Sequence, residues 1–324
     1  MTTSLGKNGP QVFPVALGCM AMSGVYGATS DDASVALIGN AIDRGITLID
    51  TGDFYANGHN ELLVGRAIAG RRDKVQLSVK FGMLRAPDGA FLGADCRPAA
   101  VKNFATYSLR RLGVDVIDIY RPARLDPQVP IEDTIGAIAD LVKGGYVRHI
   151  GLSEVGVETI RRAAKVHPIA DLQIEYSLVT RKPEDKIFPA LAELGISATL
   201  YGVMSRGLLT GSKLTAGDMR GHMPRFTAAN RATNEPVVAS IAAFAADQRR
   251  TPGELLIAWA LAKQPTLVPL IGARTPAQLD AIFAAAQRPL TAAEVAALEA
   301  LVPPDAIAGD RYVAAQMVHL DSER

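Results

Sequence analysis

Short apolar runs alternate with longer segments of helical periodicity along almost the whole chain. The apolar runs are continuous in Val, Ile and Leu, which is typical of parallel strands buried on both faces. The predicted strands lie at residues 15–18, 46–50, 75–80, 116–120, 147–152, 169–173, 197–201 and 267–271. Eight strands, each followed by a helix, predict a closed α/β barrel of the (β/α)8 TIM type.

Segments with apolar residues at helical spacing lie between the predicted strands. They include residues 31–44, 98–112, 131–143, 157–166, 187–194 and 276–285. Two of these segments begin with start signals. Ser30 precedes the first, and Thr275 with Pro276 opens the last, which places proline in the first helical turn.

The interval between the seventh and eighth predicted strands is much longer than the others. It contains residues 206–235, rich in Gly, Thr, Asn, Met and Arg, and then two apolar periodic segments at 236–248 and 252–263. We expect a long active-site loop after strand 7 and an extra helix, because long loops in compact domains are usually functional. No segment resembles a linker, so we expect one barrel domain over residues 1–324.

The composition limits the classes of function that the chain can serve. Its 324 residues are 48% hydrophobic, with 34 Lys+Arg against 33 Asp+Glu. This composition excludes a disordered chain. The net charge of +1 argues against a dedicated nucleic-acid-binding protein. No apolar tract reaches the ~20 residues of a membrane span, and no secretory signal is evident. We expect a cytoplasmic protein of undetermined oligomeric state, with no nucleic-acid or membrane partner.

Cysteine and histidine usage predicts no metal site. Cys19 and Cys96 are too few for a disulfide framework, and they form no CxxC pair. The 5 histidines show no helical i, i+4 pairing and no convergent spacing.

Three titratable residues stand out where the predicted strands end, which is the catalytic end of such barrels. Asp50 ends the second strand, Tyr55 follows in its loop, and Lys80 ends the third strand. A lysine at the end of an apolar strand is costly unless an acid such as Asp50 neutralises it. The lysine's charge would lower the pKa of Tyr55 and suit it to acid–base catalysis. Structural roles, such as a cap for Asp50 and a rim position for Tyr55, explain these residues equally well at this point.

Seven longer stretches occur in register with the predicted strands between residues 17 and 280. They are LIDTGDFYANGHNELLVGRAI, LSVKFG, LRRLGVDVIDIY, IGAIADLVKGGYVRHIGLSE, LQIEYSLVTR, YGVMSRGLLTG and LIGARTPAQL. Together they closely resemble the aldo-keto reductase superfamily. The resemblance implies an NADPH-dependent oxidoreductase that reduces an aldehyde, ketone or keto-sugar to an alcohol. Asp50, Tyr55 and Lys80 match three members of the family's catalytic tetrad, with Tyr55 as proton donor and Lys80, oriented by Asp50, tuning it.

The resemblance also implies where NADPH binds. Gly18 and Met20 would lie beside the nicotinamide ring, near Asp50. The side chains of Ser153 and Gln173 would hydrogen-bond the carboxamide of that ring. Tyr201 would stack on the ring. Ser205, Gly207 and Leu208 match the positions around the pyrophosphate, and Gly272, Arg274 and Gln278 match those around the adenosine 2′-phosphate. A helix N-terminus with an arginine suits a phosphate, because free N–H groups and the guanidinium both attract an anion. Arg274 therefore favours NADPH over NADH.

The sequence departs from the family at the fourth catalytic position. Ala123, in the stretch YRPARLDP, stands where the resemblance implies a histidine. Losing a donor to a developing oxyanion typically costs ~10²–10³ in rate. Three interpretations stay open: Tyr55 and the substrate's own hydroxyls orient the carbonyl, the pocket suits a bulkier or different carbonyl compound, or the protein is a catalytically weak nicotinamide-dinucleotide-binding sensor or interaction subunit. Arg121 and Arg124 are expected in rim or salt-bridge roles.

Two more features affect the predicted site. Glu154 follows Ser153 where many members of the family carry asparagine, so one carboxamide contact is altered. The tail, residues 310–324, is expected either to fold over the barrel mouth, where it would help to set specificity, or to fray as a free terminus.

Overall fold

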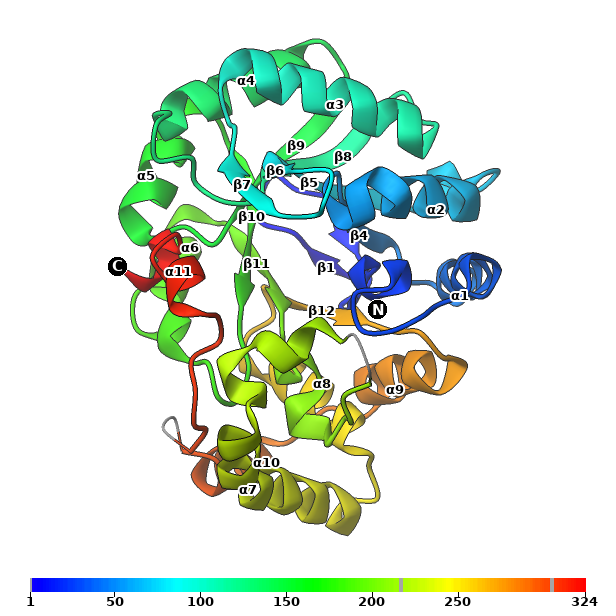
Figure 1. The fold of residues 1–324 in the computed structure, drawn as a ribbon, viewed down its shortest axis with the longest axis vertical. Helices are drawn as coiled ribbons and strands as arrows, with labels where there is room; N and C mark the ends of the chain where they lie inside the picture. Colours follow the sequence, from blue (N-terminus) through cyan, green and yellow to red (C-terminus); the bar gives the residue numbers. More distant parts are fainter. Residues whose placement is uncertain (1, 216–217, 304–305) are drawn as a thin grey trace.

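Eight parallel strands close into a barrel at the centre of the molecule, and helices surround it (Figure 1). This computed structural model describes residues 2–215, 218–303 and 306–324. The barrel strands are β3 (Ala16–Gly18), β4 (Leu48–Gly52), β5 (Gln76–Phe81), β8 (Ile117–Pro122), β9 (Val147–Ser153), β10 (Ile169–Glu175), β11 (Ser197–Tyr201) and β12 (Leu267–Gly272). The predicted (β/α)8 barrel is confirmed.

The outer helices begin where the sequence supplies caps. The side chains of Ser30, Thr251 and Thr275 each accept a hydrogen bond from a backbone N–H in the first turn of the helix that follows, α1 (Asp31–Asp43), α8 (Pro252–Lys263) and α9 (Pro276–Gln287) respectively. The helices are α1 (Asp31–Asp43), α2 (His59–Ile68), α3 (Pro98–Leu112), α4 (Ile131–Lys143), α5 (Val157–Val166), α6 (Ile187–Leu194), α8 (Pro252–Lys263), α9 (Pro276–Gln287) and α10 (Ala292–Leu301). Among the described residues, no helix combines the length and apolar character needed to cross a bilayer.

The segment after β11 differs from the loop predicted at residues 206–235. Three short 3-10 turns, η5 (Ser205–Thr210), η6 (Met219–His222) and η7 (Pro224–Phe226), precede helix α7 (Ala228–Asp247). The helix begins at Ala228 rather than at residue 236, because the Thr227 side chain caps it by accepting a hydrogen bond from the Asn230 N–H at 3.3 Å. The residues of its first two turns are mostly polar and show no apolar periodicity, so the sequence pattern did not predict them as helical.

A small hairpin covers one end of the barrel. Strands β1 (Thr3–Ser4) and β2 (Gln11–Val12) pair antiparallel, and Leu5 and Val12 pack on the apolar residues that point into the barrel from β3, β4, β8 and β12. Towards the opposite end, where the strands terminate, buried polar side chains appear in place of apolar ones. They are Asp50, Ser78, Lys80, Arg121 and Gln173.

The C-terminal segment ends far from the helix it follows. After α10 the chain runs back across the molecule through the short helix α11 (Ala314–Met317) to the carboxyl terminus (Figure 1), where Asp321 accepts a hydrogen bond from the Gly156 N–H at 2.8 Å. A second hairpin, β6 (Met83–Arg85) with β7 (Phe91–Ala94), follows β5.

Candidate active site

A buried ion pair between Asp50 and Lys80 lies inside the polar end of the barrel. The Lys80 ammonium donates to Asp50 Oδ1, and the two residues are only 4% and 2% exposed. The other carboxylate oxygen accepts hydrogen bonds from Ser78 Oγ at 2.7 Å and from Gln173 Nε2 at 2.9 Å. Three donors therefore fix the carboxylate, and the carboxylate in turn fixes the lysine.

Tyr55 stands over this ion pair. It opens the short turn η2 (Tyr55–Gly58) that follows β4, and the Lys80 ammonium lies 5.1 Å from the centre of its ring. Phe54 packs edge-on against the same ring with the centroids 4.9 Å apart. A Cβ atom on Gly52 would be in van der Waals contact with the tyrosine ring at 3.4 Å, so the ring lies directly against the end of β4.

The electrostatics of Tyr55 differ from the sequence-based prediction. Burial raises the pKa of the phenol well above its ordinary value, and the Asp50 carboxylate raises it further. The net shift is opposite to the expected lowering, because burial and the Asp50 carboxylate outweigh any lowering of the phenol's pKa by positive charge. Burial also lowers the pKa of the lysine itself. The phenol therefore keeps its proton at neutral pH, as a proton donor must.

The residues predicted to surround the nicotinamide converge on the same end of the barrel. Gly18 is paired in register with Asp50 on one side and with Gly272 on the other. Ser153 and Gln173 are register partners on β9 and β10. Met20 begins the turn η1 (Met20–Ser23), which follows Gly18. The structure thus brings these positions together, while their roles toward a cofactor stay predictions.

The positions predicted for the phosphates form two further segments. In the first segment, Ser205, Arg206 and Gly207 all have positive φ. The Ser205 hydroxyl accepts a hydrogen bond from Arg225 Nη1 at 3.0 Å. The side chain of Leu208 is buried. A Cβ atom on Gly207 would lie 2.7 Å from Ser212 Oγ, so this tight turn requires glycine.

The second segment precedes α9. There the exposed Arg274 donates to the Tyr26 carbonyl oxygen at 2.9 Å, and the Gln278 side chain accepts from the Arg274 N–H at 2.8 Å. Arg274 therefore directly precedes the N-cap of α9, Thr275, and its role toward a phosphate stays a prediction.

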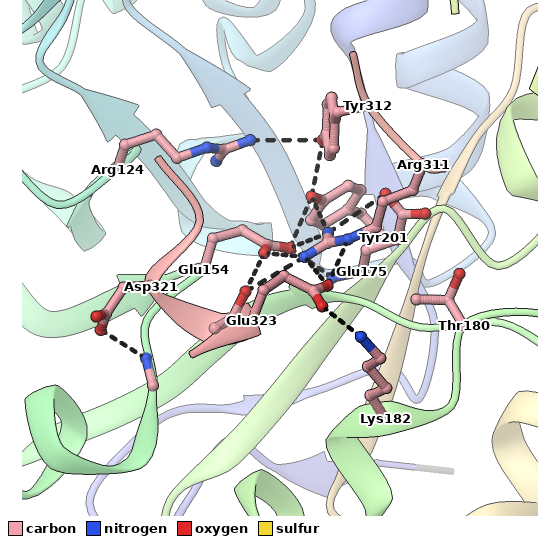
Figure 2. A network of polar contacts seen from close by, with 12 residues as sticks. Arg124, Glu154, Glu175, Thr180, Lys182, Tyr201, Arg311, Tyr312, Asp321 and Glu323 are labelled. Carbon is pink, nitrogen blue, oxygen red and sulfur yellow. Dashed lines mark hydrogen bonds and ion pairs between the residues drawn. The ribbon is translucent and has the colours of Figure 1, made fainter. Parts of the chain in front are cut away.

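The tail folds over the barrel mouth, which decides between the two alternatives left open by the sequence (Figure 2). Arg311 donates to Glu154 at 2.8 and 3.0 Å, and Ser322 Oγ donates to the same carboxylate at 2.6 Å. The Tyr201 hydroxyl donates to Glu154 at 2.7 Å and lies 2.9 Å from the hydroxyl of Tyr312. In the sequence Glu154 differs from the family only as a substitution, and no local pattern indicates that it anchors the tail.

Burial alone would raise the pKa of Glu154. The hydrogen bonds and positive charge of Arg311, together with more distant Arg124, outweigh burial and lower that pKa to about 2. The carboxylate is therefore ionised at neutral pH and holds the tail by charge as well as by hydrogen bonds.

The two arginines near Ala123 have different environments. Arg121 is fully buried and pairs with Asp171 at 2.9 Å, so its role is structural. Arg124 is partly buried and turns its guanidinium towards Tyr312 (Figure 2). Ala123 itself is 1% exposed, and its backbone N–H donates to the Phe81 carbonyl oxygen at 2.9 Å.

Comparisons with known proteins agree on one family. The sequence model of the aldo/keto reductase family matches residues 14–303. A probable aldo-keto reductase 1 from Glycine max is 36% identical over 317 residues, covering 95% of this chain and 90% of that protein. A glycerol dehydrogenase structure from Gluconobacter oxydans matches with a TM-score of 0.84 at 28% identity, covering 94% of this chain and 96% of that one. An aldo/keto reductase from Klebsiella pneumoniae in complex with NADP and acetate matches with a TM-score of 0.74 at 25% identity, covering 96% and 98%.

Proposed function

This chain belongs to the aldo/keto reductase family, and from that premise we propose that it reduces a carbonyl compound to an alcohol with NADPH, using Tyr55 as the proton donor. The observation that carries the proposal is the placement of Tyr55 over the buried Asp50–Lys80 pair. The substrate class is an aldehyde, ketone or keto-sugar of small size. Similarity to named reductases and dehydrogenases supports the reaction type.

The residues present fit a nicotinamide dinucleotide laid across the barrel mouth. Tyr201 supplies an aromatic ring, Ser153 and Gln173 supply neighbouring hydrogen-bonding side chains, and Arg274 supplies an exposed cation at a helix N-terminus. We assign Gly18, Met20 and Asp50 to the nicotinamide end. Ser205, Gly207 and Leu208 are assigned to the pyrophosphate, and Gly272, Arg274 and Gln278 to the 2′-phosphate. When bound, NADPH supplies the hydride that the carbonyl carbon accepts.

The protein's own contribution to the reaction is position and proton supply. Tyr55 holds its proton because burial raises its pKa, and it gives that proton to the carbonyl oxygen as negative charge develops there. Lys80 then faces the phenolate left on Tyr55 and stabilises it by charge. Asp50 keeps Lys80 in place, and Gln173 and Ser78 keep Asp50 in place.

Ala123 leaves the expected histidine donor out of this arrangement, and it favours a second candidate function. A protein that binds the dinucleotide but turns substrate over feebly would act as a sensor or as an interaction subunit. The intact Asp50, Tyr55 and Lys80 favour the enzyme, because a sensor would need none of them in this geometry.

Steady-state oxidation of NADPH with a panel of aldehydes, ketones and keto-sugars distinguishes the two functions. We expect turnover by the wild-type protein and at least a 10²-fold loss in Tyr55→Phe, roughly the contribution of one general acid. NADPH should bind both proteins with similar affinity. Binding without turnover on any compound would support the sensor, and an active Tyr55→Phe variant would refute the proton-donor assignment.

A further inference from the structure

Arg124 lies at the rim of the barrel mouth, in the loop that follows β8. The hydrogen bond from the Ala123 N–H to the Phe81 carbonyl oxygen fixes this loop beside the strand that carries Lys80. The guanidinium is close enough to Tyr55 that its positive charge offsets part of the rise in the pKa of that phenol. Arg124 therefore belongs to the surroundings of the proposed proton donor.

The other arginines in the tail and beneath it are balanced by carboxylates. Each guanidinium lies 2.8–3.6 Å, nitrogen to oxygen, from a glutamate carboxylate. Arg206 and Arg225 pair with Glu175. Arg311 pairs with Glu154 and Glu323. Figure 2 shows the part of this cluster that holds the tail. Such pairing is the usual requirement for a buried charge, because an isolated ion loses its hydration.

Arg124 has no carboxylate in direct contact within the described ranges, and only the more distant Glu154 offsets its charge. Its guanidinium donates to the Ala123 carbonyl oxygen at 2.6 Å and to the Tyr312 hydroxyl at 3.4 Å, and neither acceptor is a carboxylate. A guanidinium has five N–H donors in a planar fork, so donors remain for a ligand. Its contacts with the loop and with the tail hold it in place before any ligand binds.

We propose that Arg124 binds a carboxylate on the substrate, so that the preferred substrates are carbonyl compounds that carry a carboxylate group. This inference rests on the proposed reductase function. A carboxylate accepts two parallel hydrogen bonds from a guanidinium, and its single charge is balanced by one arginine. A phosphate, with a charge of about −1.5 to −2, would leave excess negative charge beside Glu154.

The same contact gives a physical role to the alanine at position 123. Without the histidine, no side chain at that position donates to the carbonyl oxygen. A substrate held by its carboxylate on Arg124 is restrained in orientation, and restraint of the reacting carbonyl contributes to the rate by proximity. Arg124 would thus be a specificity-determining residue that also positions the carbonyl toward Tyr55.

Matched substrates test this assignment. We would measure kcat and KM at saturating NADPH for succinic semialdehyde and for butanal, which has the same chain length without the carboxylate. Glyceraldehyde 3-phosphate and glyceraldehyde form the phosphate arm. The proteins are the wild type, Arg124→Gln, Arg124→Lys and the control Arg110→Gln, which changes an exposed arginine on α3. Competitive inhibition by succinate and NADPH affinity are measured in parallel.

The expected result is a selective loss. Arg124→Gln should lower kcat/KM for succinic semialdehyde by roughly ten- to a hundredfold more than it lowers kcat/KM for butanal, and this extra loss should appear mainly in KM. Arg124→Lys, which keeps the positive charge, should retain an intermediate preference for succinic semialdehyde over butanal. Inhibition by succinate should be weaker in Arg124→Gln than in the wild type. The affinity for NADPH should stay unchanged in all variants. Equal losses on both aldehydes, or no loss on either, would overturn the assignment, as would a preference for the phosphorylated aldehyde alone. If the wild type reduces no carbonyl compound, the proposed function itself fails.

Discussion

Arg311 joins the tail to the barrel through Glu154, donating two hydrogen bonds to its carboxylate at 2.8 and 3.0 Å. Both side chains are buried, and the carboxylate also accepts from Tyr201, the aromatic residue proposed to stack on nicotinamide. One ion pair thus connects the C-terminal segment to the cofactor side of the site.

Removing this arginine should release the tail. In Arg311→Met, Glu154 would stay buried without its cation. Leaving a buried charge unpaired typically destabilises the folded arrangement by about 3–5 kcal/mol, here the docked position of the tail. We expect faster amide hydrogen exchange across residues 310–324 and weaker NADPH binding. The control is Lys182→Met, because that lysine is 79% exposed and its pair with Glu323 contributes little. Unchanged exchange in Arg311→Met would show that other contacts hold the tail.

The barrel was predictable because its signals are local. The continuous apolar runs place β9 and β11 near their observed bounds, since strands buried on both faces leave that pattern in the sequence. Asp50 and Lys80 were predictable as a pair for the same reason, because they stand on adjacent strands, although Asp50 lies in the middle of β4 rather than at its end.

The parts that were missed depend on distant contacts. Glu154 and Arg311 are 157 residues apart, and no periodic pattern marks such a pair. The direction of the pKa shift in Tyr55 depends on burial, which the sequence cannot supply for a loop residue. The early start of α7 at Ala228 was hidden by polar residues that a surface helix tolerates.

The Asp50–Lys80 pair allows stability to be separated from catalysis. Lys80→Met leaves Asp50 buried with an unbalanced charge, and we expect the free energy of unfolding to fall by about 3 kcal/mol. The double variant Lys80→Met with Asp50→Asn removes that charge and should recover most of the loss. Neither variant should reduce carbonyl compounds. Urea denaturation and NADPH oxidation measure the two effects, and activity returning together with stability would mean that Lys80 has only a structural role.

Arg274 should set the preference between the two nicotinamide cofactors. Its exposed guanidinium stands before α9, where a 2′-phosphate would meet both its charge and the helix N-terminus. We expect Arg274→Gln to weaken NADPH binding by roughly tenfold, a typical value for one charged hydrogen bond, and to leave NADH binding nearly unchanged. Arg44→Gln is the control, since Arg44 pairs with Asp280 on the same helix. Fluorescence titration with each cofactor measures both affinities; equal weakening of the two would place Arg274 away from the 2′-phosphate.

Asp53 should make the stability of the protein depend on pH. Burial, reinforced by the nearby Glu61 carboxylate, raises the pKa of Asp53 from 3.8 to about 7. One oxygen accepts a hydrogen bond from the Gly82 N–H at 3.3 Å, and the other, Oδ1, is buried without a partner among the described residues. Between these two pKa values the folded protein binds more protons than the unfolded chain. The free energy of unfolding therefore falls as pH rises through this window, by at most about 4 kcal/mol.

Asp53→Asn tests this dependence, because asparagine resembles the protonated carboxyl and does not ionise. We expect the two proteins to have similar stability in urea denaturation at pH 4, and the variant to be the more stable at pH 8. Every other titrating group is common to both, so the difference isolates Asp53. Asp73→Asn, which changes an exposed carboxyl, should follow the wild type at both pH values. Parallel stability curves for Asp53→Asn and the wild type would show that Asp53 is already ionised in the folded protein.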